Sequence, residues 1–160
     1  MPIILYRIDD RLVHGQVVEA WVPYLQAGEI AVISDDIARD AMRQTIMRFA
    51  APEGVGLKIL PVAEAPAYLL TAETSASNIL VLLPGLAEAV ELIKKGVKIT
   101  KLNVGGMHYS AGKNLSIGKA IFLNDADCAA LRSLSGSGVI IEGRGVPSDS
   151  PLNLVEAIAG

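Results

Sequence analysis

The sequence of 160 residues has little cysteine, few aromatic residues and no long apolar run. Cys128 is its single cysteine, so no disulfide can form within the chain, and this favours a reducing compartment. Its mean hydropathy is +0.43. Runs such as residues 79–83 nevertheless fall far short of the roughly 20 apolar residues that a membrane-spanning helix needs. We therefore expect the apolar residues to form the core of one globular domain over residues 1–160.

The chain also lacks an excess of basic residues. Fourteen Lys and Arg oppose 17 Asp and Glu, a net charge of -3, which argues against general binding of nucleic acid or anionic membranes without excluding a local patch. The N-terminus lacks the basic and then apolar order of a signal peptide, so we expect a cytoplasmic protein. Two histidines far apart with no third ligand at metal spacing predict no metal site, and we expect no cofactor. Neither a dinucleotide fingerprint nor a P-loop is present.

Short unbroken apolar runs alternate with segments of helical periodicity, which is typical of a parallel sheet covered on both faces. The fold class predicted is α/β, an open, doubly wound, mainly parallel sheet with helices on both faces and a ligand crevice at the carboxyl ends of its strands. The expected strands are residues 3–8, 30–34, 57–60, 79–83, 101–104, 120–123 and 139–142.

Five helices are expected between and after these strands. The first covers residues 14–26, and Gly28 follows as the residue that terminates it. The second begins after Asp35 and Asp36, whose carboxylates can cap it. Three further helices are expected: one after residue 85, one capped by Asn124, and one after Ser150. The apolar residues of the second helix fall on one face: Ala38, Ala41, Met42, Ile46 and Phe49. Those of the last helix form its inner stripe: Leu152, Val155 and Ile158.

The densest polar cluster directly follows the first strand. Asp9, Asp10 and Arg11 precede His14, which falls where a helix begins. The free amides and the dipole of a helix start favour negative charge and keep an imidazole neutral and nucleophilic. Either carboxylate, Asp9 or Asp10, could hold one ring nitrogen and so fix which nitrogen attacks. Arg11 supplies a guanidinium fork suited to phosphate oxygens.

These residues describe a histidine that accepts and hands on a phosphoryl group. Arg11 and the amides of Gly15 and Gln16 would compensate the charge of the transferring group. On the residues alone, the alternative is an ordinary ion pair of Asp10 with Arg11 beside a packed His14. Loops that follow other strands supply further candidates for a flap or a partner contact: Ser34, Asp35, Asn103, Gly105, Gly106, His108 and Lys113.

The string RIDDRLVHGQV at residues 7–17 resembles the N-terminal signature of the IIB components of the mannose/fructose/sorbose family of bacterial sugar phosphotransferase systems (PTS). The likeness extends over essentially the whole chain, with similar residues at 33–36, 51–55, 102–107 and 145–147. Residues 106–109 resemble the N-acetylgalactosamine branch of this family.

The resemblance implies a phosphocarrier. The histidine that matches His14 receives a phosphoryl group from a IIA component and passes it to a sugar carried by the membrane subunits IIC and IID. The matching Arg11 helps to hold the phosphoryl group, and Asp9 and Asp10 help to shape the loop. The resemblance further implies an open α/β fold, peripheral association with the membrane complex and, as an open option, a homodimer.

Two other functions stay open at this point. The chain could be a regulatory phosphoprotein whose His14 signals sugar supply, or an anion-binding α/β module without turnover. Cys128, the residue type that other PTS IIB families phosphorylate, has no phosphate-binding loop around it, and we expect a small buried residue. Trp21 is expected in the core.

Overall fold

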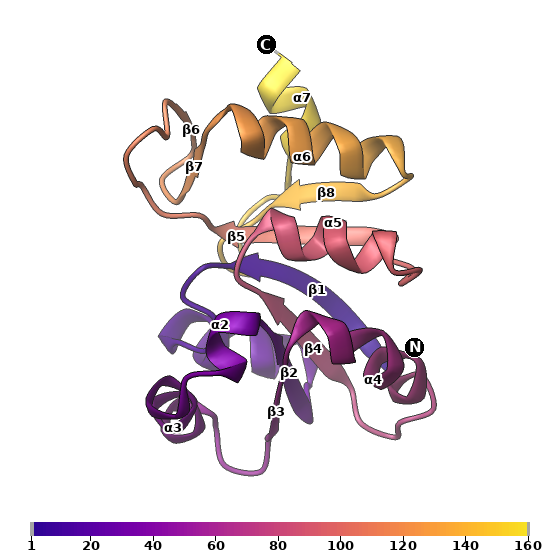
Figure 1. Cartoon of the computed structure of the whole chain (residues 1–160). Helices are drawn as coiled ribbons and strands as arrows, with labels where there is room; N and C mark the ends of the chain where they lie inside the picture. The colour runs from indigo at the N-terminus through magenta and orange to yellow at the C-terminus, as the bar shows by residue number, and fades with distance from the viewer. Residues whose placement is uncertain (1, 160) are drawn as a thin grey trace.

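The computed structural model describes residues 2–159 and contains a seven-stranded sheet in the order β3-β2-β4-β1-β5-β8-β9 (Figure 1). All neighbouring strands are parallel except β8 and β9. This sheet contains β1 (Ile3–Asp9), β2 (Glu29–Ile33), β3 (Gly56–Leu60), β4 (Ile79–Leu83), β5 (Lys101–Gly106), β8 (Ile140–Gly143) and β9 (Leu152–Asn153). The mainly parallel sheet that the sequence predicted is confirmed.

One expected strand lies outside this sheet. β7 (Ile121–Leu123) pairs antiparallel with β6 (Leu115–Ile117) as a separate hairpin. The sequence prediction treated residues 120–123 as one more strand of the main sheet, which is wrong. Its apolar residues still pack inward, since Ile121 and Leu123 are buried against the main core.

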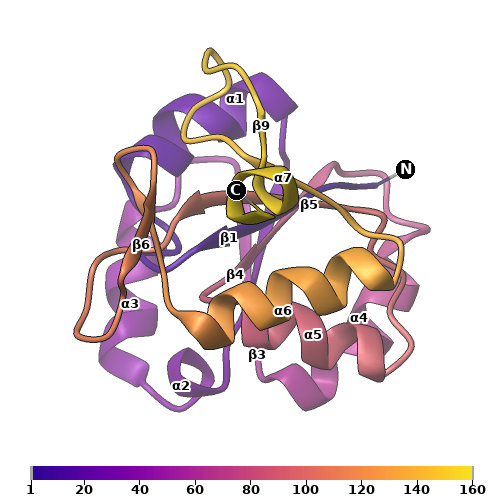
Figure 2. The same cartoon turned by 90° about the horizontal axis from the view of Figure 1, so that it is seen from above.

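Apolar clusters cover both faces of the sheet. Along β4, Ile79, Val81 and Leu83 belong to one cluster, and Leu80 and Leu82 belong to the other. The second cluster lies beneath η1 (Val17–Trp21), α1 (Val22–Leu25), α2 (Asp35–Ala38) and α3 (Ala41–Ala50). The first is covered by η2 (Val62–Glu64), α4 (Ala65–Ala72), α5 (Leu86–Lys94), α6 (Asp125–Gly136) and α7 (Leu154–Ala159). Figure 2 shows α1 on one side of the strands and α4, α5 and α6 on the other. Within residues 2–159, no helix has the length and apolar character needed to cross a membrane.

The first helix is shorter and less regular than expected. It begins at Gly15 and passes through a π-helical turn, η1, before α1. It ends at Leu25 because Gln26 adopts the left-handed conformation, with φ of 52°. The left-handed residue that ends a helix is often glycine, but here Gln26 takes that conformation, two residues before Gly28.

The second predicted helix is two helices. Ser34 caps α2, since its Oγ accepts a hydrogen bond from the amide of Ile37, so the expected capping by Asp35 and Asp36 is wrong. Asp40 then caps α3 by accepting from the amide of Arg43. The extended backbone of Asp40 therefore interrupts the helical path between α2 and α3.

The apolar face expected on this second helix is exposed. The side chains of Met42, Ile46 and Phe49 on α3 are 75%, 60% and 87% exposed, and Met47 is the buried residue of this helix. At the C-terminus, Leu152 lies in β9 and is exposed, so it does not belong to the inner stripe of α7. The capping of α6 by Asn124 is confirmed.

Candidate functional site

The site is built on the turn that follows β1. β1 lies beside β5, with Asp9 opposite Gly106, and the amide of Asp10 donates to the carbonyl of Gly106 at 3.0 Å. Leu12 then takes a left-handed conformation, with φ of 57°, and its side chain is buried. The buried Leu12 anchors the turn, which delivers His14 to the start of the helix at the carboxyl edge of the sheet.

A buried carboxylate holds the ring of His14. Oδ2 of Asp9 lies 2.9 Å from Nε2 of His14, and Oδ1 of Asp9 accepts from the amide of Arg11 at 3.1 Å. Asp9 is fully buried, whereas the side chain of His14 is 14% exposed. An ionised carboxylate can only accept a hydrogen bond, so Nε2 carries the proton and the lone pair of the neutral ring lies on Nδ1.

Asp9 is held in its charged form. Burial opposes ionisation, but the hydrogen bond and charge of His14, the amide of Arg11 and the charge of Arg7 outweigh it and lower the pKa of Asp9 below its ordinary value. The carboxylate can therefore act only as a hydrogen-bond acceptor for His14 at neutral pH.

Arg7 is a site residue to which the sequence interpretation gave no role. Its side chain is fully buried, and its Nη2 donates to Oδ2 of Asp9 at 3.2 Å and to the carbonyl of Gly145 at 2.9 Å. Its Nη1 donates to the carbonyl of Arg144 at 2.9 Å and to Oδ1 of Asn103. Burial lowers the pKa of Arg7, and the charge of Asp9 opposes that shift. A charged residue within an apolar strand was the available signal.

The network around Arg7 fixes the loop after β8. Trp21 is buried as expected, and its Nε1 donates to the carbonyl of Gly145 at 2.9 Å. The guanidinium of Arg7 lies 4.9 Å from the centre of the Trp21 ring. On the other side, Nδ2 of Asn103 donates to Oε2 of Glu142 at 2.8 Å. The ring of Trp21 and the backbone of the loop thus enclose Arg7 and keep it against Asp9.

We predict that Gly105→Ala destabilises the protein. A Cβ at Gly105 would lie 1.8 to 2.2 Å from three guanidinium atoms of Arg7, so the buried Arg7 would have to move. Overpacking of this kind costs roughly 2–3 kcal/mol, which urea denaturation should show as a lower free energy of unfolding. The matched control is Gly136→Ala, whose Cβ would meet nothing within 4 Å. Equal stability of the two variants would contradict this account of Arg7.

Stability should also depend on pH through Asp9. Because the folded-state pKa of Asp9 is lower than the value of about 3.9 expected in an unfolded chain, its stabilising contribution is complete above about pH 4. It is lost as the pH falls through the lower folded-state pKa. We expect the free energy of unfolding, measured in urea at pH 7 down to pH 3, to fall less steeply in Asp9→Asn than in the original chain. A parallel fall in both would exclude Asp9 as a source.

Arg11 and the first residues of the helix form the exposed side of the site. Arg11 is about half exposed, its Nε lies 3.8 Å from Oδ1 of Asp9, and its Nη2 donates to Oε1 of Gln16 at 3.4 Å. Gly15 and Gln16 are exposed and begin the helix next to His14. A positive group and free amides thus stand beside the histidine on the side that a partner can reach.

Asp10 contacts a different histidine. Its Oδ1 lies 2.5 Å from Nδ1 of His108, and its Oδ2 accepts from the amide of His108 at 2.6 Å. Of the two aspartates that could have held the ring of His14, Asp9 is therefore the one in contact with it. Asp10 instead ties the connection between β5 and β6 to the turn after β1.

Several residues expected at a flap or partner contact are buried in the fold. Ser34, Asn103, Gly105 and Gly106 are buried, so they cannot meet a partner at the surface. The exposed Asp35 accepts from the amide of Val62 at 2.8 Å, and Lys113 pairs with Asp127 at the start of α6. Among the residues expected there, His108 is the one that combines exposure with contact to the turn after β1.

A cavity of about 360 Å³ lies beside the site at the carboxyl edge of the sheet. Glu88 lies half-buried in its wall, and burial, followed by the charges of Asp35 and Asp36, raises the pKa of Glu88. The loops after β1, β2 and β4 meet there, as the predicted sheet requires. The lining includes Leu12, Ser34, Asp35, Pro84, Gly85 and Glu88.

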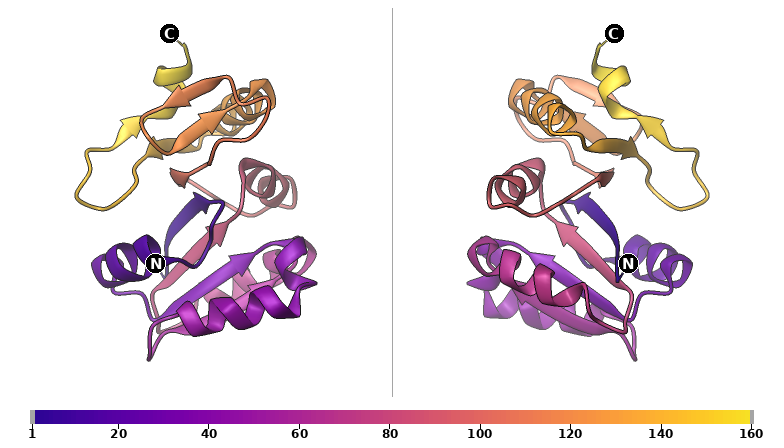
Figure 3. Two further views of the ribbon diagram at one scale, coloured as in Figure 1. Left: turned by 90° about the vertical axis from the view of Figure 1, so that its left-hand side faces the viewer. Right: turned by 90° about the vertical axis from the view of Figure 1, so that its right-hand side faces the viewer.

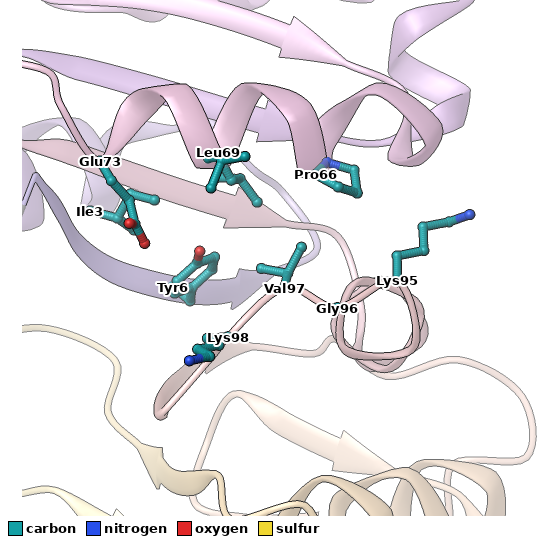
Figure 4. Close-up of a pocket in the computed structure, with 10 residues that line it drawn as sticks. Ile3, Tyr6, Pro66, Leu69, Glu73, Lys95, Gly96, Val97 and Lys98 are labelled. Atoms are coloured by element: carbon teal, nitrogen blue, oxygen red, sulfur yellow. The ribbon is translucent and has the colours of Figure 1, made fainter.

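A second cavity, of about 390 Å³, lies at the opposite edge (Figure 4). It lies between the first half of β1, α4 and the segment before β5, with Ile3, Tyr6, Leu69 and Glu73 in its wall. Burial, helped by the charge of Glu73, raises the pKa of Tyr6 to about 12. This cavity is at the amino ends of the strands, apart from His14. Over residues 2–159, no group of three or more His, Cys, Asp or Glu is arranged to hold a metal ion.

Fold and site together define an open α/β domain that presents a carboxylate-held histidine at the carboxyl edge of its sheet. Comparison with known families then places the chain. The family model described as PTS system sorbose subfamily IIB component matches residues 3–159. The chain belongs to this family, and the resemblance of residues 7–17 is confirmed.

Individual relatives agree with this assignment. The sorbose-specific EIIB component of Lacticaseibacillus casei is 35% identical over 99% of this chain and 96% of its own length. The mannose-specific EIIAB component of Escherichia coli K12 is 33% identical, and the chain spans 49% of that longer protein. The crystal structure of the IIB domain of the sorbose permease from Klebsiella pneumoniae superposes with a TM-score of 0.91 at 34% identity, over 99% of this chain and 97% of that one.

Proposed function

We propose that His14 accepts a phosphoryl group from the phosphohistidine of a IIA component and passes it to a sugar imported by the membrane subunits IIC and IID. The observation that carries this proposal is the 2.9 Å contact between Oδ2 of Asp9 and Nε2 of His14. It leaves Nδ1 as the nucleophile. In the first step the bond from phosphorus to the donor nitrogen breaks and the bond to Nδ1 forms. In the second, a hydroxyl oxygen of the sugar attacks phosphorus, the bond from phosphorus to Nδ1 breaks, Nδ1 regains its lone pair, and the hydroxyl proton is released to solvent.

The charges of the site fit this transfer. When Nδ1 carries a phosphoryl group and Nε2 keeps its proton, the ring becomes cationic, and the buried carboxylate of Asp9 stabilises that charge. Arg11 and the amides of Gly15 and Gln16 offset the negative charge spread over the transferring oxygens. Arg7 acts through Asp9, because its Nη2 bonds to the same oxygen that receives His14. No metal ion is required by this arrangement.

The names of the relatives suggest the substrate class and the partners. They include sorbose, mannose, fructose and N-acetylgalactosamine systems, all at 33% to 35% identity. We infer a hexose or an amino-hexose as the final acceptor. The E. coli relative that combines IIA and IIB, of which this chain spans about half, supports a IIA component as the donor. In this role the protein acts in the cytoplasm and associates with a membrane complex.

A two-stage transfer assay tests the proposal. The chain is incubated with labelled phosphoenolpyruvate, enzyme I, HPr and a IIA component, and should acquire an acid-labile, alkali-stable label. Vesicles that contain IIC and IID and enclose no donor are then added with mannose, fructose, sorbose or N-acetylgalactosamine, and one sugar should remove the label. An unlabelled chain would contradict the carrier proposal. Labelling that no sugar discharges would instead favour a regulatory phosphoprotein.

A further inference from the structure

Helix α3 turns its apolar stripe outward. Met42, Ile46 and Phe49 follow one another at four- and three-residue spacing, so they share one face of the helix, and all three are mostly exposed. The inward side consists of the buried Met47 and of Gln44, whose Nε2 donates to the carbonyl of Ile37 at 2.8 Å. Within residues 2–159, the other large exposed apolar residues lie singly on separate segments: Tyr24, Leu70, Tyr109, Ile140 and Leu152.

Arginines flank this stripe on both sides. At about 100° of rotation per residue, Arg43 lies about 60° beyond Ile46 on one side of the stripe, and Arg48 lies about 100° beyond Phe49 on the other, past Thr45. Both are exposed, and α3 contains no acidic residue. Nη1 of Arg48 reaches the carbonyl of Leu57 at 3.5 Å, and Lys58 is exposed on the neighbouring edge strand β3. A chain of net charge -3 thus carries one apolar face with basic margins.

We propose that this face of α3 binds the surface of an anionic lipid bilayer. A helix that buries Phe, Ile and Met at the boundary of headgroups and acyl chains, with basic side chains reaching the phosphates from its flanks, is the arrangement of an interfacial helix. The charge of this face favours an anionic lipid surface over a protein of the membrane complex as the partner of α3. The cytoplasmic loops of membrane proteins carry an excess of Lys and Arg, which would repel Arg43 and Arg48, whereas anionic headgroups attract them.

Helix α3 lies on the side of the molecule that carries the His14 site. In Figures 1 and 2, α3 lies on the side to which the arrowheads of β1 and β5 point. In the left panel of Figure 3 that side faces the viewer, with α3 in front. Lipid contact through α3 would therefore keep the edge that carries His14 close to the bilayer. This orienting role rests on the proposed function, whereas the lipid binding itself does not.

Sedimentation with vesicles tests the proposal on the whole chain. The chain should sediment with vesicles of phosphatidylglycerol and phosphatidylethanolamine and stay in solution with phosphatidylcholine alone, and added salt should weaken the binding. Met42→Ser with Phe49→Ser should lower the partition coefficient about tenfold or more. Arg43→Gln and Arg48→Gln should each lower it about fivefold. The matched controls are Leu70→Ser, another exposed apolar residue, and Arg132→Gln on α6, and they should bind like the original chain.

The outcomes separate this proposal from the transfer reaction. All the variants should keep the original far-ultraviolet circular dichroism. Met42, Arg48 and Phe49 line neither the site around His14 nor the cavity beside it, so their variants should keep the original rate of phosphorylation by IIA in solution, whereas Arg43 lines that cavity and its variant is compared in lipid binding alone. Failure of the original chain to bind anionic vesicles, or equal losses in the controls, would overturn the lipid proposal and leave the carrier proposal intact. Slower phosphorylation of the Met42→Ser, Phe49→Ser variant would show instead that α3 docks a protein, and dissociation of a dimer in that variant would show that it docks a second copy.

Discussion

His14→Ala should leave a folded chain that takes up no phosphoryl group. The substitution removes the only imidazole that Asp9 holds, and no other nucleophile then stands between Arg11 and the start of the helix. Oδ2 of Asp9 keeps its bond to the buried Arg7, so the turn should persist. The measurement is the labelling of the chain by phosphoenolpyruvate through enzyme I, HPr and IIA, with circular dichroism to verify the fold.

His108→Ala is the matched control for this experiment. It removes the other histidine, which is exposed and bound to Asp10, and should leave labelling at His14 in place. Label that persists in His14→Ala, or that disappears in His108→Ala with the fold intact, would contradict the assignment of the nucleophile.

The second large effect is expected for Arg11→Ala. Loss of one donor aimed at developing charge typically costs about 10²–10³ in rate, and Arg11 is the half-exposed guanidinium beside the histidine. Rapid-quench measurement of phosphoryl transfer from IIA should show this slowing. The midpoint of thermal unfolding should change little, because Arg11 is half exposed and its 3.8 Å ion pair with Asp9 is long, while Asp9 keeps its bond to the buried Arg7.

Two further variants test whether the slowing depends on the guanidinium group of Arg11. Arg11→Lys keeps the charge but loses the planar fork, so it should recover part of the rate. Arg39→Ala removes another exposed arginine, one that pairs with Asp36, and should transfer at the original rate. Near-normal transfer in Arg11→Ala would remove Arg11 from the mechanism.

Local patterns in the sequence predicted the sheet and the position of the histidine. Residues 79–83 form an unbroken apolar run because β4 is buried on both faces, and the structure shows β4 over the same residues. The string at residues 7–17 placed His14 after a strand and before a helix, as observed. Both features depend on residues that are close together in the sequence, so a local pattern can reveal them.

The surroundings of Asp9 depend on contacts that no local pattern contains. Arg7 reaches the carbonyl of Gly145 across 138 positions of the chain, and His108 reaches Asp10 across 98. The sequence therefore could not show which aspartate holds His14, or that Gly105 must lack a side chain to leave room for Arg7. It also could not show that Asn103 is buried between Arg7 and Glu142.

The error at α3 has a different physical cause. Periodicity shows that Met42, Ile46 and Phe49 share a face, but it does not show which way that face points. The extended Asp40 separates α2 from α3, so the outward face of α3 does not continue the helical periodicity of α2. An apolar face without a neighbour in the fold is then evidence about surroundings outside the chain.

The most direct test of the whole account is nuclear magnetic resonance of the phosphorylated chain labelled with ¹⁵N at its histidines. Coupling between phosphorus and nitrogen identifies both the residue and the ring atom that carry the phosphoryl group. The contact of Asp9 with Nε2 predicts a phosphoryl group on Nδ1 of His14, with Nε2 protonated. A phosphoryl group on Nε2 of His14, or on either nitrogen of His108, would contradict it.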